Sequence, residues 1–66
     1  MTVRVNGREH TVAPRITIAA LLEQLAVPAD GVAVAVGNEV VPRTRHGDHH
    51  LEEGDEVEIV RAVGGG

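Results

Sequence analysis

Alternating apolar and polar residues at the start of the chain predict a β-hairpin over residues 2–13. Asn6-Gly7 divides the two runs, and Asn-Gly is the residue pair favoured by a two-residue type I′ turn. The cross-strand pairs that follow from this turn are Thr2–Thr11, Val3–His10, Arg4–Glu9 and Val5–Arg8. This register places an opposite-charge pair and a Thr–Thr pair on one face, and both are favourable neighbours. The other face turns four apolar side chains toward a core: Met1, Val3, Val5 and Val12.

The spacing of the apolar residues next changes to that of an amphipathic helix. Thr17 is suited to the N-cap position. The residues that follow at helical spacing form one apolar stripe: Ile18, Leu21, Leu22 and Leu25. Pro28 is expected to end the helix, because the residue before a proline is disfavoured in the α conformation. A helix of about nine residues is too short to be stable alone, so it must pack on a sheet.

Two strands joined by a tight turn are predicted in the middle of the chain. Residues 32–36 are apolar at every position, which is typical of a strand that is central in its sheet or covered. Gly37-Asn38 allows a tight turn into a short strand over residues 39–41, which Pro42 closes. The next segment, residues 43–50, is polar and is expected to be irregular, with at most one helical turn.

The final part of the chain predicts a last strand with two different faces. Leu51 is expected to be buried, and Glu53-Gly54-Asp55 is expected to turn the chain into the strand. Val57 and Ile59 then point inward, and the opposite face carries Glu56, Glu58 and Val60. Elements in this order predict an α+β domain, in which one helix packs on one face of a mixed sheet.

Composition excludes several classes of function. The chain has 66 residues and a net charge of −4, and it contains no cysteine and no aromatic residue. Without cysteine there are no disulfides, thiolate metal sites or iron–sulfur clusters. Nucleic-acid binding needs a basic face and commonly aromatic stacking, so it is not expected. No apolar run is long enough for a membrane span and no signal-peptide pattern opens the chain, so a cytoplasmic protein without a membrane partner is expected.

The chain ends in Gly64-Gly65-Gly66, directly after the predicted last strand. Four extended residues from Val63 reach roughly 13 Å, so such a thin tail could place the α-carboxylate of Gly66 in another protein's active site. A frayed terminus or a linker remnant is the alternative. We therefore expect a folded domain over residues 1–63 and a flexible tail over residues 64–66. Lysine is absent, so an activated terminus would make this protein the donor of an acyl group and not its recipient.

The order of elements resembles that of the small ubiquitin-like sulfur carriers, most closely the family of thiamine biosynthesis. The resemblance covers essentially the whole chain and rests on four segments: the Asn6-Gly7 hairpin, the Leu21-Leu22 helix, residues 54–60 and the closing residues 62–66. It implies a β-grasp fold, in which the last strand lies centrally and projects the tail. Related sequences commonly carry an aromatic residue in the segment where this chain has Arg45-His46-Gly47.

The resemblance further implies a carrier that acts as a cosubstrate and has no catalytic residues. A partner adenylyltransferase would use ATP and Mg²⁺ to convert the Gly66 carboxylate into an acyl-adenylate. Sulfur from a persulfide-bearing protein would then displace AMP and leave a thiocarboxylate, which thiazole synthase would consume. Gly64 and Gly65 would provide the thin approach to the partner's active site. The chain itself is expected to bind no cofactor and to be a monomer on its own.

Histidines give a second candidate site in the polar segment before the last strand. His46, Asp48, His49 and His50 lie close together in sequence, and imidazole binds zinc, copper and nickel. Adjacent histidines on a loop seldom converge in tetrahedral geometry, so a solvated loop without metal is favoured. His10 is interpreted as a sheet-edge residue and not as a ligand.

Acidic residues gather between positions 52 and 58. They form either a solvated face or a surface that steers the chain toward a basic partner. Glu58 and its neighbour Val60 on the outer face of the last strand are candidate partner contacts, since the cores of interfaces favour apolar groups.

Two other functions stay open. A sulfur carrier for molybdopterin synthesis would share the fold and the glycine tail, although such chains are usually longer. A non-covalent β-grasp binding module would not need its terminal carboxyl, so it would keep its function with one residue appended after Gly66.

Overall fold

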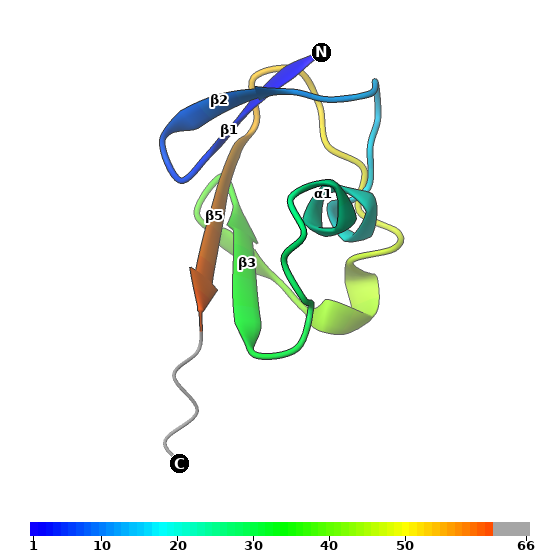
Figure 1. Ribbon diagram of the computed structural model, residues 1–66, viewed down its shortest axis with the longest axis vertical. Coiled ribbons are helices and arrows are strands. Elements are labelled where there is room, and N and C mark those ends of the chain that lie inside the picture. The colour runs from blue at the N-terminus through cyan, green and yellow to red at the C-terminus, as the bar shows by residue number, and fades with distance from the viewer. Residues whose placement is uncertain (62–66) are drawn as a thin grey trace.

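Five strands form one mixed sheet in the order β2-β1-β5-β3-β4, and one α-helix crosses one face of it (Figure 1). The computed structural model describes residues 1–61. In chain order the elements are β1 (Thr2–Val5), β2 (Arg8–Thr11), α1 (Ile18–Gln24), β3 (Val32–Val36), β4 (Glu39–Val41), the 3₁₀ helix η1 (Arg43–Arg45) and β5 (Glu56–Arg61). The predicted α+β class is confirmed. The predicted domain boundary at residue 63 and the tail over residues 64–66 lie outside the described residues.

The amino-terminal hairpin has the predicted turn and register. Asn6 and Gly7 have positive φ angles of 51° and 83°, as a type I′ turn requires. All four predicted pairs are present. Two hydrogen bonds extend the ladder beyond them: the Met1 amino group donates to Val12 O (2.9 Å), and Val12 N–H donates to Met1 O (2.8 Å). The hairpin therefore includes the first residue of the chain.

The last strand lies at the centre of the sheet. β5 runs parallel to β1 and antiparallel to β3, with five residue pairs to β3 that extend from Val36–Val57 to Val32–Arg61. β3 lies between β5 and β4, so its apolar sequence is that of an interior strand, as predicted. The carboxyl end of β5 points away from the β1–β2 hairpin (Figure 1).

The helix begins at the predicted N-cap, where Thr17 Oγ1 accepts a hydrogen bond from Ala20 N–H (3.1 Å). The first N–H groups of a helix have no partner within it. Two of them bind carbonyls of the polar segment over residues 43–50: Ile18 N–H donates to His49 O (3.1 Å), and Ala19 N–H donates to His46 O (3.0 Å). This segment therefore holds the start of the helix, and η1 is its single helical turn.

The helix ends before the predicted position, and Pro28 does not end it. Its last helical residue is Gln24, and Ala26 has a positive φ angle of 58°. Two backbone hydrogen bonds form a Schellman motif: Ala26 N–H donates to Glu23 O (3.0 Å), and Val27 N–H donates to Leu22 O (2.9 Å). Glycine is the usual residue at this position, so the sequence contained no clear stop signal here. Within residues 1–61, no helix is long and apolar enough to cross a membrane.

The core lies between α1 and the inner face of the sheet. It consists of ten buried apolar side chains: Val3, Val5, Val12, Ile18, Leu21, Leu22, Val34, Val41, Leu51 and Val57. Leu51 is completely buried, as predicted. Met1, Leu25 and Ile59 are partly buried and pack against this cluster. Aliphatic side chains on both sides of the sheet–helix interface therefore stabilise the fold by excluding water.

Candidate functional site

The candidate site is the end of β5, where the chain leads toward its glycine terminus. β5 ends at Arg61, the last described residue. The predicted site residues Gly64, Gly65 and Gly66 lie outside the described residues, so the structure describes the strand that leads to them and the surfaces on either side of it.

The side chain of Asn6 forms hydrogen bonds with β5. β1 ends at Val5, and the next residue reaches across to β5. Asn6 Oδ1 accepts a hydrogen bond from Ile59 N–H (2.8 Å), and Asn6 Nδ2 donates to Ile59 O (3.2 Å). Asn6 N–H also donates to Val57 O (2.9 Å). The side-chain amide thus makes the two hydrogen bonds that a further backbone residue of β1 would make. It extends the pairing with β5 beyond the end of β1.

This contact was missed from the sequence. Asn6 has the residue type of a turn, which is all that a local pattern could indicate. Its partner Ile59 is 53 residues away, and nothing in either segment signals the pairing.

The two faces of β5 differ as predicted. Val57 is buried and Ile59 is partly buried against the core, while Glu58 is exposed and Val60 is 57% exposed. The register places Ala33 opposite Val60 and Ala35 opposite Glu58. The outer face around the candidate contact residues is therefore formed by small or apolar side chains.

An apolar patch extends from Val60 across the outer face to the edge of the sheet. Ala35 pairs with Val40 on β4, and Val40 is 67% exposed. We call Val60, Ala33, Ala35 and Val40 the outer patch. Val40 was not singled out from the sequence, because it lies on the opposite face from both Glu39 and Val41, and this polar and apolar pair does not indicate which face is buried.

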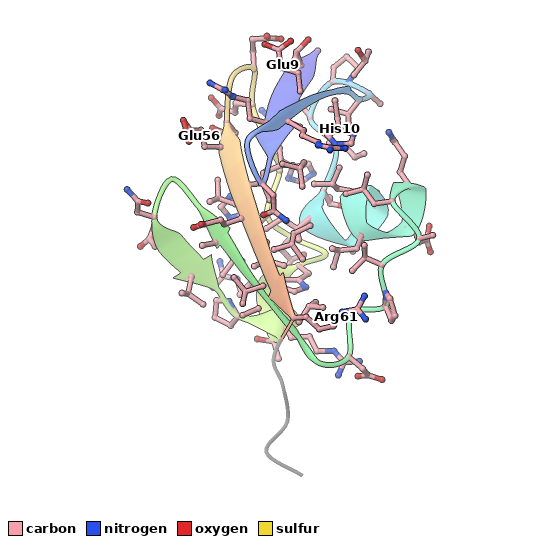
Figure 2. The ribbon with its side chains drawn as sticks, turned by 60° about the vertical axis from the view of Figure 1, so that its left-hand side comes forward. Glu9, His10, Glu56 and Arg61 are labelled. Carbon is pink, nitrogen blue, oxygen red and sulfur yellow. The ribbon has the colours of Figure 1, made fainter. Side chains whose placement is uncertain are left out.

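Charged residues occupy the other half of the outer face. Arg4 lies opposite Glu9 on β2 and opposite Glu56 on β5. Figure 2 shows Glu9 and Glu56 toward the hairpin end of β5, and Arg61 at its opposite end. The outer face therefore changes from charged at the hairpin end to apolar at the carboxyl end of β5.

The acidic stretch has two different parts. Glu53 Oε1 accepts a hydrogen bond from Thr2 N–H (3.1 Å), and Asp55 Oδ2 accepts one from Glu52 N–H (2.8 Å). These carboxylates hold the turn before β5. Glu56 and Glu58 are exposed, and their side chains have no hydrogen bond or ion pair within residues 1–61. The carboxylates of Glu56 and Glu58 are therefore free to contact a partner.

The histidine segment differs from its prediction at one position. His46 is 4% exposed and its Nε2 lies 3.1 Å from Val41 O, so the expectation of a fully solvated loop is wrong for this residue. Its ring is buried because the segment folds back to bind the start of α1. His49 is half-buried and His50 is exposed. Within residues 1–61, no three metal-ligating side chains are grouped so that they could hold a metal ion. His10 lies on the edge strand β2, as predicted.

Fold and strand order define a protein of the ubiquitin-like β-grasp class, with its last strand in the centre of the sheet. The family model of the ThiS family matches residues 3–66. The chain belongs to this family of sulfur carrier proteins of thiamine biosynthesis, which are not enzymes.

Individual relatives agree with this assignment. The chain is 30% identical to the sulfur carrier protein ThiS of Escherichia coli over 66 residues, which cover 100% of both proteins. A crystal structure of the thiamine biosynthesis protein ThiS from Geobacter metallireducens superposes with a TM-score of 0.88, at 35% identity and with 100% of both chains covered. The chain is also 36% identical over 66 residues to a thiazole synthase of Paramagnetospirillum magneticum, where it spans 20% of that protein's length.

Proposed function

We propose that this protein carries sulfur as a thiocarboxylate on Gly66 and delivers it for thiazole formation in thiamine biosynthesis. The observation that supports this most is the family match, which extends through the terminal glycines to residue 66. The central position of β5 supports it as well, because the strand that leads to the terminus is held by β1, β3 and the Asn6 side chain.

The proposed chemistry begins with the terminal carboxylate, whose oxygen is a poor leaving group. In a partner adenylyltransferase, the Gly66 carboxylate attacks the α-phosphorus of Mg²⁺-bound ATP and pyrophosphate leaves, which gives an acyl-adenylate. A persulfide sulfur then attacks the carbonyl carbon and AMP leaves. The product is an acyl disulfide that still contains the persulfide's own sulfur–sulfur bond. A thiol attacks the donor's sulfur in this bond and forms a disulfide with the donor, and the thiocarboxylate is the leaving group. Gly64 and Gly65 allow the terminus to enter a narrow channel, since they have no side chains.

Thiazole synthase is the proposed recipient of the sulfur. The thiazole synthase of P. magneticum contains a segment similar to this entire chain. Joining two protein modules in one polypeptide raises their effective concentration for each other, which is useful when one acts on the other. This relationship also favours the thiamine pathway over molybdopterin synthesis.

The outer patch and Glu58 are the proposed contacts for the adenylyltransferase. Val60 and Val40 are the two large apolar side chains most exposed to solvent among residues 1–61. Val60 also lies in the last strand, six residues before Gly66, so a partner that binds the terminus would approach it closely. Apolar side chains at the centre of such a contact exclude water, and Glu58 at its border would orient a basic partner.

The mass of the C-terminal peptide tests the proposal. After incubation with the adenylyltransferase, ATP, Mg²⁺ and a persulfide donor, we expect this peptide to gain about 16 Da, because sulfur replaces oxygen. Deleting Gly66 or appending one alanine should abolish the gain and leave the melting temperature unchanged. Sulfur found on another peptide, or on the deletion variant, would contradict the carrier proposal. A non-covalent binding module would instead bind its partner without any mass gain.

A further inference from the structure

A groove lies on the helix side of the sheet, between the β1–β2 hairpin and the segment that follows α1. Its volume is about 480 Å³. The floor is formed by five aliphatic side chains: Val5, Leu25, Val27, Val32 and Ile59. Val5 is buried, and the other four are partly buried against the core cluster. The groove therefore exposes the edge of the hydrophobic core to solvent at the carboxyl end of β5.

All ionisable side chains that line this groove are basic. They are Arg8, His10 and Arg61. This is unusual in a chain with a net charge of −4. Arg43–Asp30 is the only ion pair within residues 1–61, so no carboxylate of this part of the chain neutralises Arg8 or Arg61. The groove is a local basic site on an acidic protein.

The basic groups are separated along the groove by its apolar floor. Arg8 and His10 belong to β2, whereas Arg61 ends β5 opposite Val32. Figure 2 shows His10 on the hairpin and Arg61 at the far end of β5. A complementary ligand therefore carries carboxylates at two separated positions and aliphatic groups between them. Arginine forms strong, often bidentate hydrogen bonds with carboxylates.

We infer that this groove binds an extended peptide segment of a partner protein in which aliphatic residues are flanked by acidic ones. The acidic flanks pair with Arg61 at one end and with Arg8 and His10 at the other, and the aliphatic residues cover the floor. The groove lies on the opposite face of β5 from the outer patch, because successive side chains of a strand alternate between faces. A partner in the groove leaves the outer patch open, so this inference stands independently of the proposed sulfur chemistry.

A titration with synthetic peptides tests the inference. The probe is acetyl-Asp-Glu-Val-Leu-Val-Glu-Asp-amide, and its neutral counterpart has Asn and Gln in place of Asp and Glu. With ¹⁵N-labelled full-length protein, the acidic peptide should shift the amide signals of Arg8, His10, Val27 and Arg61. The neutral peptide should bind roughly tenfold more weakly, which corresponds to the loss of about 1.4 kcal/mol. The acidic peptide should also lose affinity as salt is raised.

Two charge-reversal variants distinguish peptide binding at the groove from a general effect of the protein's net charge on affinity. Arg61→Glu should weaken binding of the acidic peptide by about tenfold or more. Arg45→Glu makes the same change in net charge at an exposed position outside the groove, and it should leave the affinity within about twofold of wild type. Arg8→Gln provides a milder second variant on the hairpin side, and it should also weaken binding.

Several results would overturn the inference. Equal affinity of the two peptides, equal effects of Arg61→Glu and Arg45→Glu, or signal shifts confined to the outer patch would each show that the groove is not the binding site. The chain's own terminus is another possible occupant. If removing residues 62–66 shifts the amide signals of Arg8, His10 and Val27 when no peptide is present, the groove belongs to that segment and the partner peptide is excluded.

Discussion

At the residue scale, Asn6 links the first turn of the chain to its last strand. Its backbone has the positive φ that the hairpin needs, and its side chain binds both the N–H and the C=O of Ile59. Asn38 provides a natural comparison. It follows Gly37 in the β3–β4 turn and has a φ of 70°, but its side chain makes no hydrogen bond within residues 1–61.

We expect Asn6→Gly to destabilise the protein by about 1 kcal/mol more than Asn38→Gly. Both changes create a Gly-Gly turn and carry a similar entropic cost, but only Asn6→Gly removes two hydrogen bonds, each worth roughly 0.5–1.5 kcal/mol at most sites. Urea denaturation of the two variants measures the difference, and hydrogen exchange at the Ile59 amide should become faster only in Asn6→Gly. Equal losses of stability would show that the side-chain bonds to β5 contribute nothing.

At the element scale, β5 combines a face that packs against the core with an open face that we propose as a partner contact. The alternation that predicts Val57 and Ile59 inward and Glu58 and Val60 outward agrees with the burial of each side chain. The strand is central, so its inner face packs under α1 while its outer face stays open. One strand can therefore carry two separate functions without conflict.

Substitutions of adjacent residues on β5 should separate these functions. Ile59→Ala should lower the free energy of unfolding by about 2–3 kcal/mol, because it removes partly buried methylene and methyl groups from the edge of the core. Val60→Asp should leave the melting temperature nearly unchanged and weaken binding to the adenylyltransferase, since it places a charge in the outer patch. Thermal melts and binding titrations of both variants provide the measurements. The opposite pattern would mean that the two faces of β5 are exchanged, which is a register error of one residue.

At the scale of the whole molecule, charge is distributed unevenly around a small domain. Three glutamates and one arginine lie on the outer face, namely Glu9, Glu56, Glu58 and Arg4, whereas the ionisable side chains that line the helix-side groove are all basic. The summed field of such an arrangement orients a partner before contact. The two faces of β5 are therefore suited to partners of opposite charge.

Reversing one outer charge should slow association with a basic adenylyltransferase. We expect Glu58→Arg to lower the association rate several-fold at low salt, with a smaller effect at physiological ionic strength, because exposed charges are screened over about 8 Å there. Glu23→Arg is the matched control, since it changes the net charge equally at an exposed position of α1. Stopped-flow measurements at two salt concentrations compare the variants. If Glu23→Arg slows association as much, the effect belongs to net charge and not to the outer face.

The sequence alone determined the features that depend on neighbouring residues. Asn6-Gly7 was enough to predict both the turn and the four pairs of the hairpin, because a two-residue turn leaves only one register. Thr17 marked the start of α1, and alternation assigned the faces of β5. The resemblance to the sulfur carriers, based on short segments of sequence, led to the family that the comparisons confirm.

Tertiary structure decided what depends on residues far apart in the chain. It alone determined that Asn6 binds Ile59, that Val40 joins Val60 in the outer patch, and that three basic groups from β2 and β5 meet around one groove. It also buried His46 and ended α1 at Gln24, two residues before an alanine in a left-handed conformation, both against expectation. The physical reason is common to all these cases. Local propensities differ by a fraction of a kcal/mol per residue, so packing and hydrogen bonds between distant segments decide the outcome wherever the local signals are weak.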